Sequence, residues 1–386
     1  MKILQIINSS KPEGGGPIES ICQAAKALAR NGHDVEMVCL DPPDSPWLKQ
    51  FAFDVHAVGP ASQGYRFCRD LLPWLLANLN RYDCALMNGI WLYPSRALRQ
   101  AAGKTGVPYF VYTHGMMDPG FKKLFPARHL KKLLYWKLIE HRVIRDARAV
   151  FFTCEEEQLL ARQSFGPFEC TAAIVPYCVG APPADHGEQL SAFFAAFPDL
   201  KGRRLILFLS RVHPKKGCDL LVEAFARNAG PDPSLHLVIA GPDEQDTRAR
   251  LEARARDLGI EKRLTWTGML SGPLKWGAFR AADAFALPSH QENFGIAVVE
   301  ALACGVPVLI SDRINIWREI QSAGAGLVET DTADGAAHLL ARWLALSPEE
   351  RNAMRKHADA CFAKHFRSEE AADLLVSTLR KFGVKQ

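Results

Sequence analysis

A short basic segment in the second half of the chain holds residue types that bind phosphate. Residues 210–217 read SRVHPKKG, and they lie between the apolar run 205–209 and a helical pattern over 218–226. Arginine offers a planar fork of donors and lysine a compact charge, so Arg211 and Lys216 could hold a diphosphate leaving group. Taken alone, the segment fits a solvated basic loop equally well.

Two glutamates stand in a second segment, residues 288–307, where a strand, a loop, a helix and another strand follow one another. Gly295 lets the backbone approach a ligand, and the free amides at the helix start can hold an anion. Glu300, one turn inside the helix, could accept hydrogen bonds from two sugar hydroxyls, while Glu292 in the loop could reach a different sugar. An isolated helical glutamate is usually solvated, so only the combination with Gly295 and the basic segment favours a site.

The elements that must position these residues are short apolar runs alternating with helical patterns. This alternation predicts an α/β fold of doubly wound, Rossmann-like parallel sheets, which bind ligands at the carboxyl ends of their strands. Because a single core usually stops growing at roughly 250 to 300 residues, 386 residues indicate two such domains facing a central cleft. Strands are expected at 3–7, 35–40, 54–58, 84–87, 109–112, 150–152 and 172–175, and then at 205–209, 235–240, 264–266, 284–287, 306–310 and 326–328.

A break in this pattern sets the expected domain boundaries. Residues 181–200 hold Pro182, Pro183, Gly187 and Pro198 and are interpreted as a linker. The N-terminal domain is expected over 1–180 and the C-terminal domain over 201–365. A final helix over 366–386 is expected to pack back towards the N-terminal domain.

Charge is unevenly distributed along the chain. Residues 121–148 carry nine basic and two acidic residues, so this window holds +7 and leaves −2 for the rest of a chain whose net charge is +5. That balance argues against nucleic acid as a partner. Leucines at helical spacing within the window, Leu130, Leu133, Leu134 and Leu138, suit an interfacial helix on an anionic membrane. The alternative is a helix that packs its leucines on the sheet and solvates its lysines.

The lengths of the apolar runs and the spacing of the cysteines indicate where the protein is located. No apolar run approaches the roughly 18 residues that a membrane-spanning helix needs. Ten scattered cysteines without metal-like spacing are typical of buried thiols in a reducing cytoplasm. We therefore expect a cytoplasmic protein, peripheral at the inner face of the membrane if the basic helix binds lipid.

The two charged segments together, with the glutamates in a Glu-x7-Glu arrangement, resemble the donor site of glycosyltransferase family 4, retaining enzymes of the GT-B fold. The resemblance covers nearly the whole chain, because the glycine-rich first loop (Gly14, Gly15, Gly16), Thr113-His114-Gly115, Ala240-Gly241-Pro242-Asp243 and Thr267-Gly268-Met269 match in order. The chain departs from the family pattern at Ser210 and at Asn293, where glycine is common. Both departures bear on the identity of the donor sugar more than on activity.

The resemblance implies a role for each matching position. Arg211 and Lys216 would neutralise the departing diphosphate, Glu300 would hold the ribose hydroxyls and Glu292 would contact the donor sugar. His114 would lie beside that sugar, although a lone histidine is more often structural. The implied donor contacts also include Gly15, Gly16, Gly241, Gly268, Met269, Asn293, Phe294, Gly295 and Ile296.

The function that follows is transfer of a hexose-type sugar from a nucleotide-diphosphate sugar to a saccharide or lipid-linked saccharide, in cell-envelope or exopolysaccharide synthesis. No Asp-x-Asp and no complete P-loop is present, so neither a metal nor a cofactor is expected. Two alternatives stay open. A nucleotide-sugar epimerase would share the diphosphate clamp, and a non-catalytic nucleotide-sugar-binding protein would share the whole donor site.

Overall fold

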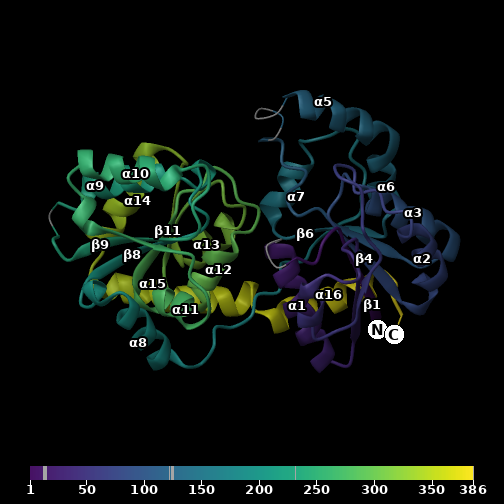
Figure 1. Cartoon of the computed structure of the whole chain (residues 1–386), viewed down its shortest axis with the longest axis horizontal. Coiled ribbons are helices and arrows are strands. Elements are labelled where there is room, and N and C mark those ends of the chain that lie inside the picture. Colours follow the sequence, from purple (N-terminus) through teal and green to yellow (C-terminus); the bar gives the residue numbers. More distant parts are fainter. Residues whose placement is uncertain (12–14, 121, 123–125, 231, 386) are drawn as a thin grey trace. The chain divides into compact units, whose positions relative to one another are not determined.

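The computed structural model describes residues 1–11, 15–120, 122, 126–230 and 232–385. The chain divides into two compact units (Figure 1). Unit 1 comprises Met1–Gly180 and Ser368–Gln386, and unit 2 comprises Ala181–Arg367. Residues 181–200, expected as a linker, belong to unit 2 and contain the helix α8 (His186–Ala196) and the 3-10 turn η5 (Pro198–Leu200).

Unit 1 is built on a parallel seven-stranded sheet with the order β3-β2-β1-β4-β5-β6-β7. Buried apolar side chains on both faces make its central strands continuous hydrophobic runs, as parallel sheets require. The order reverses between β1 and β4. Its strands are β1 (Lys2–Ile7), β2 (Asp34–Cys39), β3 (Val55–Ala57), β4 (Cys84–Asn88), β5 (Tyr109–Tyr112), β6 (Ala149–Phe152) and β7 (Ala172–Ile174).

Helices cover both faces of this sheet, and α1 packs against the last helix of the chain, α16. The helical elements of unit 1 are α1 (Gly16–Arg30), η2 (Pro46–Gln50), α2 (Leu71–Asn78), η3 (Leu79–Arg81), α3 (Tyr93–Thr105), α5 (Pro126–Tyr135), the π-helical turn η4 (Trp136–Glu140), α6 (His141–Asp146), α7 (Glu155–Ala161) and α16 (Ser368–Lys381).

Unit 2 repeats the architecture with a parallel six-stranded sheet in the order β10-β9-β8-β11-β12-β13. Here the order reverses between β8 and β11, the position at which open α/β sheets bind ligands. The strands are β8 (Arg204–Leu209), β9 (Leu235–Ala240), β10 (Leu264–Gly268), β11 (Ala282–Leu287), β12 (Val308–Ser311) and β13 (Gly326–Glu329).

The helical elements of unit 2 besides α8 and η5 flank its sheet on both sides (Figure 1). They are η6 (Pro214–Lys216), α9 (Cys218–Asn228), α10 (Thr247–Asp257), η7 (Glu261–Arg263), α11 (Gly272–Ala281), α12 (Ile296–Ala303), α13 (Trp317–Ala323), α14 (Ala333–Ala345) and α15 (Pro348–His365). The predicted doubly wound α/β class is confirmed.

Candidate functional site

The basic loop after β8 and the acidic loop after β11 meet at the carboxyl ends of these neighbouring strands. The amide of His290 donates to the carbonyl of Lys215 at 2.9 Å, and the Ser289 hydroxyl donates to the same carbonyl at 3.0 Å. Gly217 makes the approach possible, because a Cβ there would lie 2.0 Å from the carbonyl oxygen of Pro288. Both predicted segments therefore belong to one site.

Lys216 and Glu292 form an ion pair across this junction. The Lys216 side chain is only 9% exposed, and Glu292 is partly buried. The backbone of Glu292 is held on its other side, since its amide donates to Arg313 and its carbonyl accepts from Asn315. The pair is neutral overall, and it fixes the positions of a lysine nitrogen and a carboxylate side by side at the junction of the two loops.

Arg211 reaches a third loop, which follows β9. Its Nη1 lies 3.1 Å from both carboxylate oxygens of Glu244. The loops are joined by a bridge between Val212 and Asp243 and by the close approach of Gly241, where a Cβ would lie 1.8 Å from the Ser210 carbonyl. The Arg211 side chain is 57% exposed, so its guanidinium stays open to a ligand from solvent.

The turn after β10 joins the same edge of the sheet, because the Gly241 amide donates to the Gly268 carbonyl at 2.8 Å. Met269, next in the chain, is an exposed large apolar side chain. An exposed methionine beside a polar site offers a flexible, polarizable apolar surface on which a planar nucleotide base could pack.

The helix α12 carries the second glutamate of the pattern. Gly295 precedes it in a left-handed conformation with φ 73°, and Phe294 is buried beneath the loop. The side-chain carbonyl of Asn293 accepts a hydrogen bond from the side-chain amide of Asn315 at 3.2 Å. Glu300 is buried and accepts from Lys275 on α11 at 2.5 Å. Glu300 is thus oriented by a cation that the sequence pattern did not reveal.

His114 and the glycines of the first loop belong to unit 1. Gly15 lies at the N-terminal cap of α1 with φ 73°, and Gly16 is the first residue of that helix, whereas Gly14 lies outside the described residues. The residues of unit 2 that the sequence predicts as a donor site lie at the carboxyl ends of β8, β9, β10 and β11 and on α12. His114, Gly15 and Gly16 are placed at the carboxyl edge of the other sheet.

Hydrogen bonds assign the tautomer of His114. Its Nε2 lies 3.1 Å from Asn88 Oδ1, and because the Asn88 amide nitrogen donates to Gln5 at 2.8 Å, that oxygen is an acceptor. Nε2 therefore carries the proton, and the Tyr177 hydroxyl donates to Nδ1 at 2.5 Å. Burial lowers the pKa of His114 to about 3, so the ring is neutral near pH 7.

Glu157 fixes the loop that carries His114. Its buried carboxylate accepts from the Thr113 hydroxyl and the Gly115 amide, both at 2.6 Å, and from the amide and hydroxyl of Thr153, both at 2.7 Å. His114 itself has a left-handed backbone with φ 49°. The four hydrogen bonds stabilise a conformation that a histidine rarely adopts.

Residues with a strained backbone lie at the carboxyl edges of both sheets. Non-glycine residues with positive φ cluster at functional sites in proteins. Among the described residues, all those with positive φ lie in loops that follow the carboxyl end of a strand, namely Arg66, Trp91, His114, Gln245 and Asp246.

Three residues that contact the predicted site residues are not identified by the sequence pattern. Lys275, Glu244 and Tyr177 contact predicted site residues through pairs far apart in the sequence. A helical lysine, a loop glutamate and a tyrosine carry no local pattern, so only the fold identifies them. Within the described part of the chain, no group of three or more His, Cys, Asp or Glu side chains could hold a metal ion. Nor does any described helix combine the length and apolarity needed to cross a bilayer.

Comparisons with known proteins agree with this geometry. The model of the glycosyl transferases group 1 matches residues 192–360, and the model of the glycosyl transferase 4-like domain matches residues 15–178. Mannosylfructose-phosphate synthase of Agrobacterium fabrum is 34% identical over 123 residues, which cover 30% of this chain and 27% of that protein. D-inositol 3-phosphate glycosyltransferase of Geodermatophilus obscurus is 36% identical over 185 residues, covering 45% and 39%. The matched regions span less than half the length of these relatives.

A solved structure matches over the full length. Anabaena HepE in complex with UDP-glucose superposes with a TM-score of 0.74 and 18% identity, covering 99% of this chain and 100% of that chain. At this identity the likeness shows the fold alone, and that fold is the expected GT-B architecture. With one model matching each half of the sequence, the chain belongs to the group 1, family 4-like glycosyl transferases, a retaining and metal-independent GT-B family.

Proposed function

We propose that the protein transfers a hexose-type sugar, with retention of anomeric configuration, from a nucleotide-diphosphate sugar to a saccharide or lipid-linked saccharide. The observation that carries this proposal is the junction of the β8 and β11 loops, where Lys216, Glu292 and Arg211 stand within one cluster. Because HepE is described in complex with UDP-glucose, a UDP-hexose is the first donor to test.

Each residue takes a role from its position in the cluster. Arg211 and Lys216 supply the positive charge that stabilises the diphosphate as its bond to the anomeric carbon breaks. The amides at the start of α12 add partial positive charge. Glu292 orients the sugar, and Glu300, held by Lys275, accepts hydrogen bonds from the ribose hydroxyls.

In this scheme the neutral His114 acts by orientation. Both ring nitrogens are engaged by Asn88 and Tyr177, so the imidazole is not a free base. The acceptor hydroxyl attacks on the face from which the diphosphate leaves, which retains the configuration. Gly15 and Gly16, at the start of α1, lie at the edge of unit 1 that receives the acceptor.

A nucleotide-release screen tests the proposal. UDP-, GDP-, ADP- and dTDP-sugars are each incubated with the protein and a panel of saccharide acceptors. Arg211→Ala and Glu300→Gln should each lower the rate by about 10²-fold to 10³-fold, as loss of a transition-state donor or a key binding group does. Arg227→Ala, an exposed arginine on α9 outside the cluster, should keep the wild-type rate.

The outcomes also separate the alternatives. Conversion of the nucleotide sugar without an acceptor would indicate an epimerase, and tight binding without turnover would indicate a non-catalytic binder. Full activity of both site variants would contradict the site itself.

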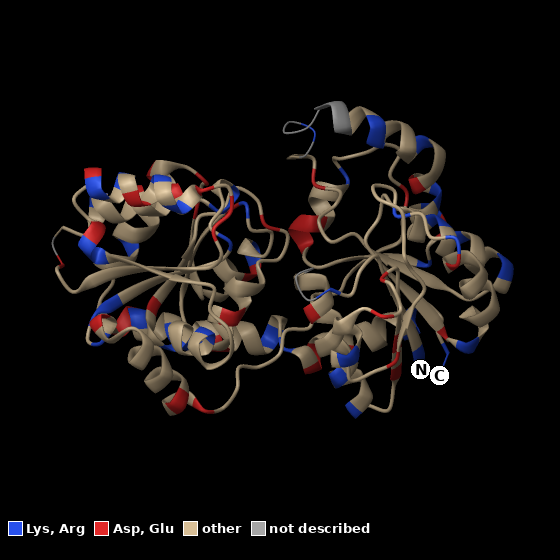
Figure 2. Cartoon of the chain, viewed as in Figure 1, with Lys and Arg blue, Asp and Glu red and all other residues tan. Residues whose placement is uncertain are grey.

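We further propose that the basic window of unit 1 binds an anionic membrane and holds the protein at the cytoplasmic face. Leu130, Leu134 and Leu138 recur at helical spacing along α5 and η4 and are 68%, 62% and 58% exposed. Exposed lysines, Lys131 and Lys137, flank them, and Figure 2 colours the Lys and Arg positions of these helices blue. Phe121, Lys123 and Phe125, also part of the window, lie outside the described residues.

Exposed leucines beside lysines support insertion into a lipid interface, where each basic residue contributes about 1 kcal/mol. Flotation with phosphatidylglycerol-containing vesicles should recover the protein, and phosphatidylcholine vesicles or high salt should not. Leu134→Glu should abolish recovery, whereas Leu159→Glu, at an exposed leucine on α7, should not. Equal flotation with neutral vesicles would exclude an electrostatic surface.

A further inference from the structure

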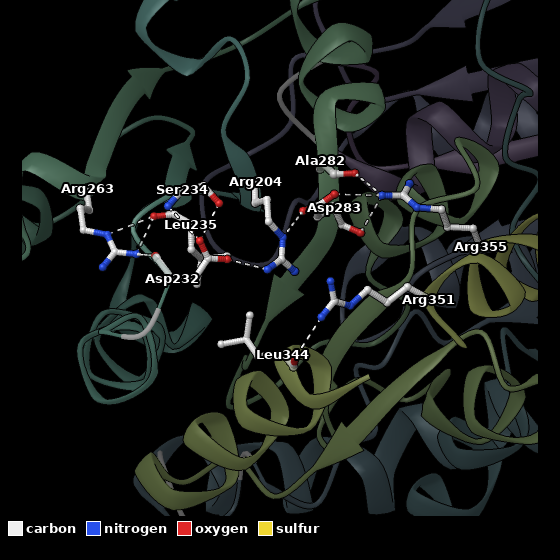
Figure 3. Close-up of polar contacts among 10 residues, drawn as sticks. All are labelled: Arg204, Asp232, Ser234, Leu235, Arg263, Ala282, Asp283, Leu344, Arg351 and Arg355. Atoms are coloured by element: carbon white, nitrogen blue, oxygen red, sulfur yellow. Dashed lines mark hydrogen bonds and ion pairs between the residues drawn. The ribbon is translucent and has the colours of Figure 1, made fainter. Parts of the chain in front are cut away.

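An arginine cluster lies at the amino ends of β8, β9 and β11, the edge of the unit 2 sheet opposite to the donor-side loops (Figure 3). Arg204 begins β8 and Asp283 is the second residue of β11. The remaining members come from the loop before β9, the turn η7 and the helix α15. The cluster comprises Arg204, Asp232, Arg263, Asp283, Arg351 and Arg355.

Four guanidinium groups face only two carboxylates in this cluster. Arg204 bridges both, donating to Asp232 at 2.6 Å and to Asp283 at 3.2 Å. The second oxygen of Asp232 is taken by the Ser234 amide and hydroxyl. Arg355 shares Asp283 at 3.4 Å. A guanidinium keeps its charge in any protein environment, so the cluster retains an excess of two positive charges.

Not all of the arginines are short of partners. The guanidinium of Arg263 donates to the carbonyls of Ala229, Asp232 and Leu235 and lies over the ring of Phe225, which accounts for its structural role. Among the described residues, Arg204 and Arg351 instead each keep one guanidinium nitrogen that no carboxylate or carbonyl takes.

Among the residues that the structure describes, two buried donors on these arginines have no hydrogen-bond partner. They are Nη2 of Arg204 and Nε of Arg351. Arg351 donates to the Leu344 carbonyl at 2.8 Å and lies over the ring of Trp343, whose Nε1 is also buried and unpartnered. Burial lowers the pKa of Arg351, and the neighbouring charge of Arg204 lowers it further. Figure 3 shows the Arg351 guanidinium directed towards Arg204 and Asp283.

We propose that a phosphate-type oxyanion binds between Arg204 and Arg351. A tetrahedral oxyanion accepts from two guanidinium forks at once and would balance the excess charge. Unpaired donors that are buried in this way normally have an ion or water as partner. The side chains of Arg204, Asp232, Asp283 and Arg355 are 28% to 34% exposed, so the cluster opens to solvent. This site is independent of the donor site and of the proposed function.

Thermal unfolding with inorganic phosphate tests the site. Against sodium chloride at equal ionic strength, phosphate at several times its Kd should raise the Tm by about 2 to 4 °C. The rise should vanish in Arg351→Gln and be smaller but still measurable in Arg351→Lys, which keeps the charge and loses the planar fork of donors. Arg342→Gln, an exposed arginine on α14 paired with Glu329, is the matched control and should keep the rise.

Phosphate bound at the donor site must be separated from this effect. Arg211→Ala removes a donor-side cation, and the rise should remain in that variant. A sugar monophosphate in place of inorganic phosphate tells a phosphate ester from the free ion as the preferred ligand. A rise that survives in Arg351→Gln, or that disappears in Arg211→Ala alone, would overturn the assignment.

Discussion

The Arg211–Glu244 contact places a carboxylate where the proposed diphosphate should bind. Both Glu244 oxygens lie 3.1 Å from Arg211 Nη1, and the arginine side chain is more than half exposed. An exposed pair of this kind contributes only about 0.2 to 1 kcal/mol, so an incoming diphosphate can displace it. In the absence of a ligand, Glu244 holds the Arg211 guanidinium in place. When a ligand arrives, the Glu244 carboxylate competes with the diphosphate for that guanidinium.

Removing that competitor should tighten nucleotide binding. Glu244→Gln should lower the Kd for UDP by up to about fivefold, the factor that corresponds to about 1 kcal/mol. Isothermal titration calorimetry measures the change. Glu252→Gln, which alters an exposed carboxylate on α10 paired with Arg248, should leave the Kd unchanged. A weaker affinity in Glu244→Gln would mean that Glu244 chiefly positions Arg211 for the ligand.

His114 should make the protein sensitive to acid. Its pKa is about 3 in the native state because of burial, against about 6.5 in an unfolded chain. The unfolded state therefore binds more protons between these values, so stability is complete above about pH 6.5 and is lost as pH falls. Urea unfolding of wild type and His114→Gln at several pH values measures the slope, which should be smaller in the variant. An unchanged slope would contradict a buried, neutral His114.

At the scale of elements, the π-helical turn η4 carries a second buried titratable group, Glu140. Its pKa shift makes stability change with pH in the opposite direction to that of His114. Glu140 is fully buried, and within the described part of the chain one of its carboxylate oxygens has no partner. Burial raises its pKa to about 7, although a hydrogen bond from Ser95 opposes the shift. Because the folded state holds the proton more tightly, stability is complete below about pH 4.5 and falls as pH rises to about 7.

Glu140→Gln should remove this dependence. The variant keeps the shape but carries no charge, so at pH 8 it should be more stable than wild type by about 2 to 3 kcal/mol. At pH 5 the two proteins should differ little. Denaturant titrations at both pH values measure the difference. A variant that is less stable at pH 8 would mean that the ionised carboxylate is satisfied in the native state.

The contact between the β8 and β11 loops depends on a glycine. Gly217 has φ 70°, and a Cβ there would meet the Pro288 carbonyl oxygen at 2.0 Å, whereas Gly259 has φ 69° with open space around it. Both alanine variants should carry the strain of a left-handed residue. Gly217→Ala should lose about 1 to 3 kcal/mol more and should bind donor more weakly, because Pro288 must move. Equal losses in thermal unfolding would show that the loops separate easily.

The same elements show how far the sequence could predict the structure. Each run predicted as a strand overlaps an observed strand, since parallel strands buried on both faces are continuous apolar runs. The prolines of residues 181–200 favour a linker. In the structure, α8 forms within this region and packs on α11. Proline in the segments flanking a helix breaks the sequence pattern without excluding the helix between them.

The site was predictable where its residues share a segment and unpredictable where they meet across the fold. Arg211, Lys216 and Glu292 follow strands that become neighbours, so their proximity follows from strand order. Lys275 reaches Glu300 only because α11 and α12 both pack against the unit 2 sheet. Hydrophobic patterns set which helices form, but they do not record which polar side chains face one another.

At the scale of the whole molecule, the chain leaves unit 1 after Gly180 and returns to it at Ser368. The last helix, α16, packs on α1, and its buried face joins the core under β1 and β5. Two polar contacts lie at the rim of this packing, the ion pair Arg30–Glu369 and the hydrogen bond from Asn31 to Asp373, both at 2.8 Å. Unit 1 is therefore complete only when the end of the chain has folded onto it.

Two adjacent leucines on α16 test that dependence. Leu375 is 3% exposed within the unit 1 core, and Leu374 is 42% exposed. Leu375→Ala should destabilise unit 1 by about 2 to 5 kcal/mol, because it removes buried methyl groups and leaves a cavity, whereas Leu374→Ala should cost far less. Amide hydrogen exchange resolves the units: Leu375→Ala should lower protection in β1 and β5 and leave β8 and β9 unchanged. Loss of protection in both sheets would mean that the two units unfold together, and no loss in β1 would mean that unit 1 is stable without the returning helix.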